Sequence, residues 1–410
     1  MINLTDVIIT TNSPGEVSAW VRPVVDELNK RDIQKNIYVF TPPCVFSSGN
    51  EGKVLSNIEG VTNTFNKKEY LKYILLNQKP TNFKPSKNGF VLFLGGDLMH
   101  AVFLGKKLGY SVYSYTENGF GFKNSIDKFY LSDNNLYNRL KNKVSNRNKL
   151  KVVGNLMYDS IKPKLTKEET IKLLNKEDNE LLINLLPGSR PKGFKYILPL
   201  YINFVGKIGK KNQNIKFILS KSPFIVENYF KNILNNKRIN EKVEYIKEEN
   251  KLLVNDDIEI KIFDKNLHSI MKETDLAITI PGTNNLELSV LETPMLVIFP
   301  LNKPELVPLQ GLVGLIGEIP ILGKYLKRKV IPKKVDETRF ISLVNRIEGE
   351  LIVPEFIGKI DSDDLAEKVL NMINNNEIEV IQNSLKSLDH NKGASKVIID
   401  DIMKEMNEMN

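Results

Sequence analysis

The chain of 410 residues contains one cysteine, three histidines and one tryptophan. Cys44 alone cannot form an internal disulfide, so the sequence is typical of a protein from a reducing compartment. The histidines are far apart in the sequence, and we therefore expect no metal site. The first residues, MINLTDVIITT, show neither a basic segment nor a cleavage signal, so we expect no secretory leader and a cytoplasmic protein.

The chain also lacks a dense block of lysine and arginine with interleaved aromatic residues, which argues against nucleic acid as a partner. The net charge is nonetheless +9, with a pI near 9.1. This charge suits an anionic substrate or an anionic membrane surface, and solubility alone is the alternative explanation. The length favours two domains, and 41% hydrophobic residues are typical of a globular protein.

The stretch Asp275–Phe299 joins two short apolar runs through a glycine turn and a helical segment. Leu276–Ile280 and Met295–Phe299 are typical of parallel strands buried on both faces. The turn Pro281-Gly282-Thr283 separates the first run from the helix. This pattern predicts a strand–helix–strand unit of a parallel sheet.

The start of that helix can bind an anion, because its first N–H groups are free and carry partial positive charge. Thr283, Asn284 or Asn285 is expected to cap it. Glu287, one turn further on, could accept hydrogen bonds from ribose hydroxyls. A strand–helix–strand unit without a ligand remains the alternative.

The first half of the chain begins with the same pattern. Val7–Thr11 is a short apolar strand, and Ser18 is expected to cap a helix that runs to about Asn29. The turn between them lacks GxGxxG, so a dinucleotide cofactor is not indicated.

A second unit of the first half places Asp97 at the carboxyl end of the apolar run Phe90–Leu94. Open α/β sheets hold their binding sites at this end of their strands. Asp97 is also a favourable N-cap for the helix that follows, Leu98–Leu108, and the two roles are compatible.

The polar stretch Lys162–Lys167 marks the predicted domain boundary. We expect domains over 1–163 and 164–385, and a last helix within 386–410 that packs on the first domain. The second domain opens with Leu181–Leu186, followed by Pro187-Gly188-Ser189-Arg190 and a helix. Arg190 is the residue type that grips a phosphate with two hydrogen bonds, although many arginines are only surface charges. His268 is expected to be a structural or surface histidine rather than a base.

Residues 301–333 combine many apolar side chains with prolines and end in Lys324, Lys327, Arg328 and Lys329. The prolines and acidic residues argue against a membrane-spanning helix. The segment either contacts an anionic membrane face or packs on the core, and both alternatives stay open.

Several motifs together resemble the lipid-A-disaccharide synthase family of GT-B glycosyltransferases. They are Gly15-Glu16, Gly96-Asp97, Val153-Gly154-Asn155, LLPGSR at 185–190, DLAITIPGTNNLEL at 275–288, PMLVIF at 294–299, VNRIEGELIVPEF at 344–356 and KGAS at 392–395. The resemblance implies an α/β fold of two Rossmann-like domains with parallel sheets facing a central cleft. It also implies an inverting, metal-independent hexosyltransferase that uses a UDP-sugar and a lipid-linked or glycolipid acceptor.

Carried over by position, the resemblance assigns roles to individual residues. Asp97 would be the base that deprotonates the acceptor, and the diphosphate and ribose would be held in the second domain. The implied substrate-binding residues are Gly15, Glu16, Gly188, Ser189, Arg190, Gly282, Thr283, Asn284, Glu287 and Asn345, and no cofactor is implied.

The chain departs from the family pattern at three places. Ala19 and Trp20 stand where the family has Gly and Asp, Glu350 stands where it has arginine, and YTENGFGF at 115–122 replaces a segment with proline and tryptophan. The acceptor could therefore differ from that of the family. A UDP-sugar epimerase of the same architecture and a non-catalytic nucleotide-sugar-binding protein are the alternatives. Peripheral attachment to the inner face of the cell membrane would fit a lipid acceptor.

Overall fold

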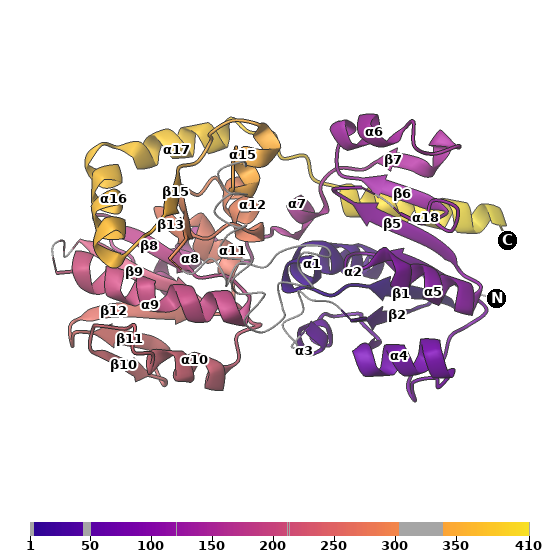
Figure 1. Cartoon of the computed structure of the whole chain (residues 1–410), viewed down its shortest axis with the longest axis horizontal. Helices are drawn as coiled ribbons and strands as arrows, with labels where there is room; N and C mark the ends of the chain where they lie inside the picture. The colour runs from indigo at the N-terminus through magenta and orange to yellow at the C-terminus, as the bar shows by residue number, and fades with distance from the viewer. Residues whose placement is uncertain are drawn as a thin grey trace. The chain divides into compact units, whose positions relative to one another are not determined.

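The computed structural model describes residues 4–43, 51–119, 121–210, 212, 214–302 and 339–409. The chain divides into two compact units (Figure 1). Unit 1 comprises Met1–Ser160 with His390–Asn410, and unit 2 comprises Ile161–Asp389. The boundaries thus lie a few residues from the expected ones at 163 and 385. The expected segment 301–333, apart from Leu301 and Asn302, lies outside the described residues.

Unit 1 contains a parallel sheet with the strand order β3-β2-β1-β4-β5-β6-β7. The strands are β1 Thr5–Thr10, β2 Lys35–Phe40, β3 Asn63–Phe65, β4 Asn88–Phe93, β5 Ser111–Thr116, β6 Lys128–Leu131 and β7 Leu150–Val152. The apolar residues of central β1, Val7, Ile8 and Ile9, are fully buried, because helices cover both faces of a parallel sheet. The strand order reverses between β1 and β4, and ligands bind at such a point in open α/β sheets.

The helices of unit 1 are α1 Pro14–Glu16, α2 Arg22–Asn29, α3 Glu51–Leu55, α4 Lys67–Leu76, α5 Leu98–Leu108, α6 Asn134–Leu140, α7 Leu156–Ser160 and α18 Ala394–Met409, with a short 3₁₀ turn at Arg147–Lys149. The prediction that Ser18 caps the first helix is wrong. The helical conformation begins at Pro14 and passes through a π-helical turn, Val17–Val21, into α2. Ser13 begins it, because its carbonyl and hydroxyl oxygens accept the N–H groups of Val17 and Glu16.

Unit 2 contains a sheet with the order β10-β11-β12-β9-β8-β13-β14-β15. The strands are β8 Leu181–Leu186, β9 Ile215–Ser220, β10 Val243–Ile246, β11 Lys251–Val254, β12 Ile258–Phe263, β13 Leu276–Thr279, β14 Met295–Pro300 and β15 Glu355–Gly358. The sheet is parallel from β12 to β15, whereas β10 and β11 add antiparallel strands at one edge. The α/β class with two Rossmann-like domains is confirmed, with this antiparallel edge as the departure.

The helices of unit 2 are α8 Lys167–Leu174, α9 Pro191–Ile208, α10 Glu227–Leu234, α11 Leu267–Lys272, α12 Thr283–Val290, α15 Leu343–Glu348, α16 Ser362–Asn374 and α17 Glu377–Lys386. Helix α9 is buried along most of its length and packs on α16. In neither unit do the described residues contain a helix with the length and apolarity required to cross a membrane.

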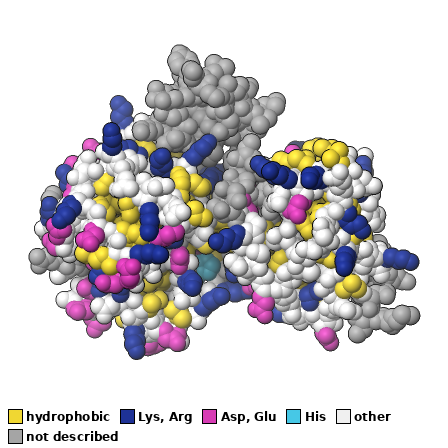
Figure 2. All heavy atoms as spheres, turned by 90° about the horizontal axis from the view of Figure 1, so that it is seen from below, with side chains coloured by type: hydrophobic (Ala, Val, Ile, Leu, Met, Phe, Trp, Pro, Cys, Tyr) yellow, Lys and Arg dark blue, Asp and Glu magenta, His cyan; other side chains and the backbone are white. Residues whose placement is uncertain are grey.

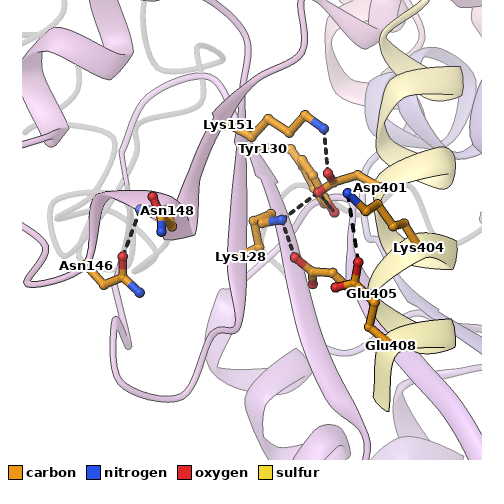
Figure 3. A network of polar contacts seen from close by, with 9 residues as sticks. All are labelled: Lys128, Tyr130, Asn146, Asn148, Lys151, Asp401, Lys404, Glu405 and Glu408. Carbon is orange, nitrogen blue, oxygen red and sulfur yellow. Dashed lines mark hydrogen bonds and ion pairs between the residues drawn. The ribbon is translucent and has the colours of Figure 1, made fainter. Parts of the chain in front are cut away.

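The last helix, α18, packs on α2 and α7 of unit 1. Asp159 anchors its start by accepting hydrogen bonds from the N–H groups of Gly393 and Ser395 and from the Ser395 hydroxyl. Further along, Asp401 binds Lys128, Lys151 and the hydroxyl of Tyr130 (Figure 3). Burial alone would raise the pKa of Asp401, but the hydrogen bonds from the two lysines outweigh it and the pKa is lowered. The helix is therefore held to the sheet by partly buried ion pairs.

Candidate active site

In unit 2 the two glycine turns lie side by side at the carboxyl edge of the sheet. They follow β8 and β13, which are parallel neighbours with Thr279 opposite Leu186. Gly188 has a φ of +90°, and a Cβ at this position would lie 2.7 Å from Cδ1 of Ile280. Only glycine adopts this backbone conformation without strain. The first turn is thus fitted against the second.

Each turn leads into the N-terminus of a helix. Arg190 immediately precedes α9, whose first residue, Pro191, needs no hydrogen-bond partner for its nitrogen. Gly282 immediately precedes α12 and is exposed. Because α9 and α12 follow adjacent strands, their N-termini direct free N–H groups and positive partial charge to the same edge of the sheet. This is an arrangement that binds an anion such as a diphosphate.

The cap of α12 differs from the expectation. Gly282 occupies the N-cap position, and neither Thr283 nor Asn284 caps the helix. Asn285 is fully buried and holds the turn from inside, because it accepts the N–H of Gly282 at 3.3 Å and donates to the carbonyl of Ile280 at 3.1 Å. Thr283 and Asn284 stay half-buried at the first turn, where the resemblance placed the diphosphate.

Lys221 adds a cation to this edge that sequence reasoning missed. It follows β9, the neighbour of β8 on the other side, and its side chain is only 11% exposed. Its Nζ lies 3.5 Å from a carboxylate oxygen of Asp264, which follows β12. The sequence signal that could have found it is a lysine directly after an apolar run, in ILSKSP at 218–223.

Glu287 has a histidine beside it. The Oε2 atom of Glu287 lies 3.7 Å from Nε2 of His268, and Nδ1 of His268 accepts the N–H of Lys162 at 3.3 Å. The carboxylate is 13% exposed. His268 therefore adjoins the residue that the resemblance assigned to the ribose. No spacing pattern could show this, since the contact depends on how α11 packs on α12.

Asn345 does not have the binding role expected of it. Its side chain is fully buried, donates to the carbonyl of Val353 and to Glu355, and accepts the N–H groups of Ile352 and Val353. All of its hydrogen-bonding groups are used inside unit 2. It fixes α15 to the segment before β15 and leaves no polar atom for a ligand.

In unit 1 the carboxyl ends of β1 and β4 adjoin each other, with Thr10 opposite Phe93. Glu16 joins the loops that follow them, because its carboxylate accepts the N–H groups of Asn12, Ser13 and Gly96 at 3.1, 3.0 and 3.3 Å. Burial raises the pKa of Glu16 even though these hydrogen bonds lower it. Glu16 is thus a residue that positions the Gly96-Asp97 turn, and Gly15 lies half-buried beside it.

Glycine is required in that turn. Gly95 and Gly96 have φ values of +127° and +87°. A Cβ at Gly95 would lie 2.2 Å from the Glu16 carboxyl carbon, and one at Gly96 would lie 2.5 Å from Nδ2 of Asn12. The side chain of Asn12 is buried, and neither of its polar atoms has a hydrogen-bond partner within the described part of the chain.

Asp97 is the N-cap of α5 and is exposed, as both expected roles require. Its Oδ1 accepts the N–H of Met99 at 3.0 Å. One turn further on, Nδ1 of His100 lies 2.8 Å from the hydroxyl of Tyr70. Burial lowers the pKa of His100, whereas the charge of Asp97 and a hydrogen bond to the Pro43 carbonyl raise it, and the net shift is downward. His100 was not considered from the sequence.

Two of the departures from the family pattern, Trp20 and the segment that begins at Tyr115, are in contact in unit 1. Trp20, in the π-helical turn, meets the ring of Tyr115 edge-on with centroids 5.2 Å apart. The hydroxyl of Tyr115 donates to Glu117 at 3.2 Å. Burial raises the pKa of Glu117 to about 7, with Asp133 and Glu16 adding to the increase. Glu117 follows β5, so a carboxyl group that titrates near neutrality lies at the same edge of the sheet as Asp97.

Comparison with solved structures defines the fold class of the chain. The chain shares its fold with UDP-GlcNAc 2-epimerase from Neisseria meningitidis, solved with UDP-GlcNAc bound, at a TM-score of 0.55 and 15% identity over 98% of this chain and 100% of that one. It is similar in the same way to the S. aureus MnaA–UDP structure, at a TM-score of 0.54 and 12% identity over 98% and 97%. The chain thus has the two-domain GT-B architecture.

The family resemblance is confirmed by sequence comparison. Residues 143–307 match the family model described as lipid-A-disaccharide synthetase. Lipid-A-disaccharide synthase 2 of Legionella pneumophila is 23% identical over 232 residues, which are 56% of this chain and 50% of the relative. The synthase of Persephonella marina is 23% identical over 200 residues, 47% and 49% of the two chains. The chain thus spans about half the length of the curated relatives it matches. The matched family segment contains Arg190, Lys221 and Glu287, whereas Asp97 lies outside it.

Proposed function

We propose that this protein is an inverting glycosyltransferase that moves a hexosyl group from a UDP-sugar to a lipid-linked or glycolipid acceptor. One observation carries the proposal: the adjacent turns after β8 and β13 bring two helix N-termini, Arg190 and Lys221 to a single edge of unit 2. The relatives named as lipid-A-disaccharide synthases give the class of reaction.

The donor would be held by unit 2. Gly188, Ser189, Arg190 and Lys221 would contact the diphosphate from one side, and Gly282, Thr283 and Asn284 would present the start of α12 to it. Glu287, with His268 beside it, would accept hydrogen bonds from the ribose. As the bond between the sugar and the diphosphate breaks, the helix starts and the two cations stabilise the charge on the departing UDP. Because this charge is compensated by the chain itself, we expect no metal requirement.

The acceptor would be activated by unit 1. Asp97 is exposed at the start of α5, and its carboxylate would take the proton of the acceptor hydroxyl as that oxygen bonds to the sugar carbon. The hydrogen bonds that Glu16 accepts from the loops after β1 and β4 would fix the position of Asp97. A lipid acceptor implies a cytoplasmic protein attached peripherally to the inner face of the membrane.

Isothermal titration with UDP tests the donor half. We expect the wild type to bind UDP without added metal and Glu287→Ala to bind it at least tenfold more weakly, since each hydrogen bond to a charged group contributes about 1.5–3 kcal/mol. Glu367→Ala, an exposed change on α16, is the matched control and should bind like the wild type. No binding by the wild type, or equal binding by Glu287→Ala, would refute the donor site.

A UDP-sugar epimerase is the second candidate, and Glu117 is the observation in its favour. Removing a proton from a sugar carbon and returning it to the other face requires two groups, and unit 1 holds two carboxyl groups at one edge with Glu117 neutral up to about pH 7. Incubation with UDP-GlcNAc alone separates the candidates, because only an epimerase forms a new UDP-sugar without an acceptor. Asp97→Asn should abolish either activity and leave UDP binding intact. A protein whose cellular role survives this change is non-catalytic.

A further inference from the structure

Three successive residues at the end of β1 bury polar side-chain atoms that have no partner. Thr10, Thr11 and Asn12 are at most 1% exposed. Neither threonine hydroxyl and neither polar atom of the Asn12 amide has a hydrogen-bond partner in the described ranges of the chain. Burying a polar group without a partner costs free energy, so its retention needs a reason. These atoms are available to a ligand that both donates and accepts hydrogen bonds.

The unpartnered amide adjoins the candidate base. Nδ2 of Asn12 lies 2.5 Å from the position that a Cβ on Gly96 would take, so the amide is directed at the turn that carries Asp97. Glu16 fixes this arrangement, because its carboxylate accepts the N–H groups of both Asn12 and Gly96. Asn12 is thus held beside the group that would activate the acceptor.

Carboxyl groups follow four neighbouring strands at this edge of unit 1. The strands are β1, β4, β5 and β6, and the residues that follow them are Glu16, Asp97, Glu117 and Asp133. None of the four forms an ion pair with a described residue. Lysine and arginine side chains are scattered over both units in Figure 2, so the chain does not lack cations. A phosphate beside the reacting hydroxyl of an acceptor would be repelled here.

Glu117 supplies a hydrogen-bond donor to the same edge. Burial above all raises its pKa to about 7, and the charges of Asp133 and Glu16 add to the increase, despite the hydrogen bond from Tyr115. A protonated carboxyl group donates one hydrogen bond and accepts others. Hydroxyl groups match this edge, because they also do both. An ammonium group only donates, so it would leave the donors of Asn12 and Glu117 unpaired.

We propose that the carboxyl edge of unit 1 binds an acceptor with an uncharged, hydroxyl-rich head group. The Asn12 amide and the Glu117 carboxyl group hold two of its hydroxyls and present a third to Asp97. This inference rests on the proposed function and deepens it, because it names the chemical class of the acceptor. That class is a neutral glycoside, rather than a sugar that carries a phosphate or an amine.

Transfer by the full chain to three matched acceptors tests this class. They are dodecyl glucoside, its 6-phosphate and its 2-amino analogue, with UDP-GlcNAc and UDP-glucose as donors. The readout is UDP release above the rate without acceptor. We expect kcat/KM to be at least tenfold higher for the neutral glucoside, and the difference from the phosphate should narrow at high salt, which screens repulsion. Equal or faster transfer to the phosphate or the amine overturns the proposal.

Asn12→Leu tests the amide. We expect it to raise KM for dodecyl glucoside at least tenfold without lowering the urea midpoint, since it removes a buried amide that has no partner. Asn36→Leu is the matched control, because the Asn36 amide donates to Asp6 at the opposite end of the same sheet. The control should lower the urea midpoint and leave KM unchanged. A wild-type KM in Asn12→Leu refutes the role of the amide.

Glu117→Gln keeps a hydrogen-bond donor but cannot ionise. In the wild type, KM for dodecyl glucoside should rise about tenfold from pH 6 to 8 as Glu117 loses its proton, and in the variant it should stay constant. The same pH dependence in both proteins overturns the role of Glu117.

Titration with UDP accompanies every protein. A wild type that binds UDP but transfers to none of the three acceptors overturns this inference alone. A wild type that does not bind UDP overturns the proposed donor site.

Discussion

The cation after β9 allows a sharp test of where the diphosphate binds. Lys221→Met removes a charge from the carboxyl edge of the unit 2 sheet and keeps the length of the side chain. If the donor site is as proposed, the variant should bind UDP more weakly. Its fold should persist, because the partner Asp264 is 50% exposed and can be solvated by water once Lys221 is gone.

The magnitude follows from the environment of the lysine. A hydrogen bond to a charged group contributes about 1.5–3 kcal/mol. Asp264 already lies 3.5 Å from Nζ of Lys221 and compensates part of its charge, so we take the lower end of this range. A loss of about 1.5 kcal/mol raises the Kd for UDP roughly tenfold. The cost in unfolding free energy should stay below about 1 kcal/mol, as for other partly exposed ion pairs.

Lys216 provides a control on the same strand. It lies at the opposite end of β9 and pairs with Glu180 at 3.1 Å. Lys216→Met should cost similar stability in urea unfolding and leave the Kd for UDP unchanged by isothermal titration. Equal affinities of wild type and Lys221→Met would show that the phosphate lies elsewhere. Equal weakening by both variants would show a general effect of charge or folding.

Two further predictions concern unit 1. Burial raises the pKa of Glu117 from an ordinary value of 4.5 to about 7, so between these pH values the unfolded chain has lost a proton that the folded chain keeps. The unfolding free energy should therefore fall as the pH rises from 4.5 to 7, by at most about 3 kcal/mol, and Glu117→Gln should remove this slope in urea titrations at several pH values. A variant with the slope of the wild type would contradict the burial of Glu117. Asp159→Ala leaves one buried and one half-buried N–H group at the start of α18 without acceptors and should lower the unfolding free energy by about 2–5 kcal/mol. The control is Asp400→Ala, a change on α18 itself that breaks a partly exposed ion pair with Arg31 and should cost less than about 1 kcal/mol. Equal costs of the two variants would show that Asp159 does not anchor α18.

The local units were predictable from the sequence. Leu276–Ile280 and Met295–Phe299 were expected as strands, and the structure has them within one residue of these bounds, as β13 Leu276–Thr279 and β14 Met295–Pro300. Short apolar runs bounded by polar and turn residues carry this information, because a strand buried on both faces has no polar positions. The start of the first helix was not predictable in this way. A π-helical turn does not follow the 3.6-residue spacing, and the loop at Ser13 and Glu16 is fixed by contacts with Gly96, eighty residues away.

The residue types in the sequence identified single functional candidates, but not the residues that contact them. Asp97 and Arg190 were identified because each follows an apolar strand and opens a helix. Asn345 was assigned to a ligand by resemblance, and the structure shows instead that its amide is used by Val353, Ile352 and Glu355. An asparagine in a motif has the same letter whether its amide faces a ligand or the backbone, so only packing separates the two.

The sequence by itself determined the strand–turn–helix units, the glycines at Gly95, Gly96 and Gly188, and the acidic or basic residue after each turn. These features depend on neighbours within a few residues, where periodicity and backbone sterics act. Only the tertiary structure decided that β13 pairs with β8, that Lys221 joins the same edge, and that His268 lies beside Glu287. Strand order and helix packing bring together segments up to about a hundred residues apart. Such contacts depend on which faces of the sheet and of the helices are buried together, and a local sequence pattern does not contain this information.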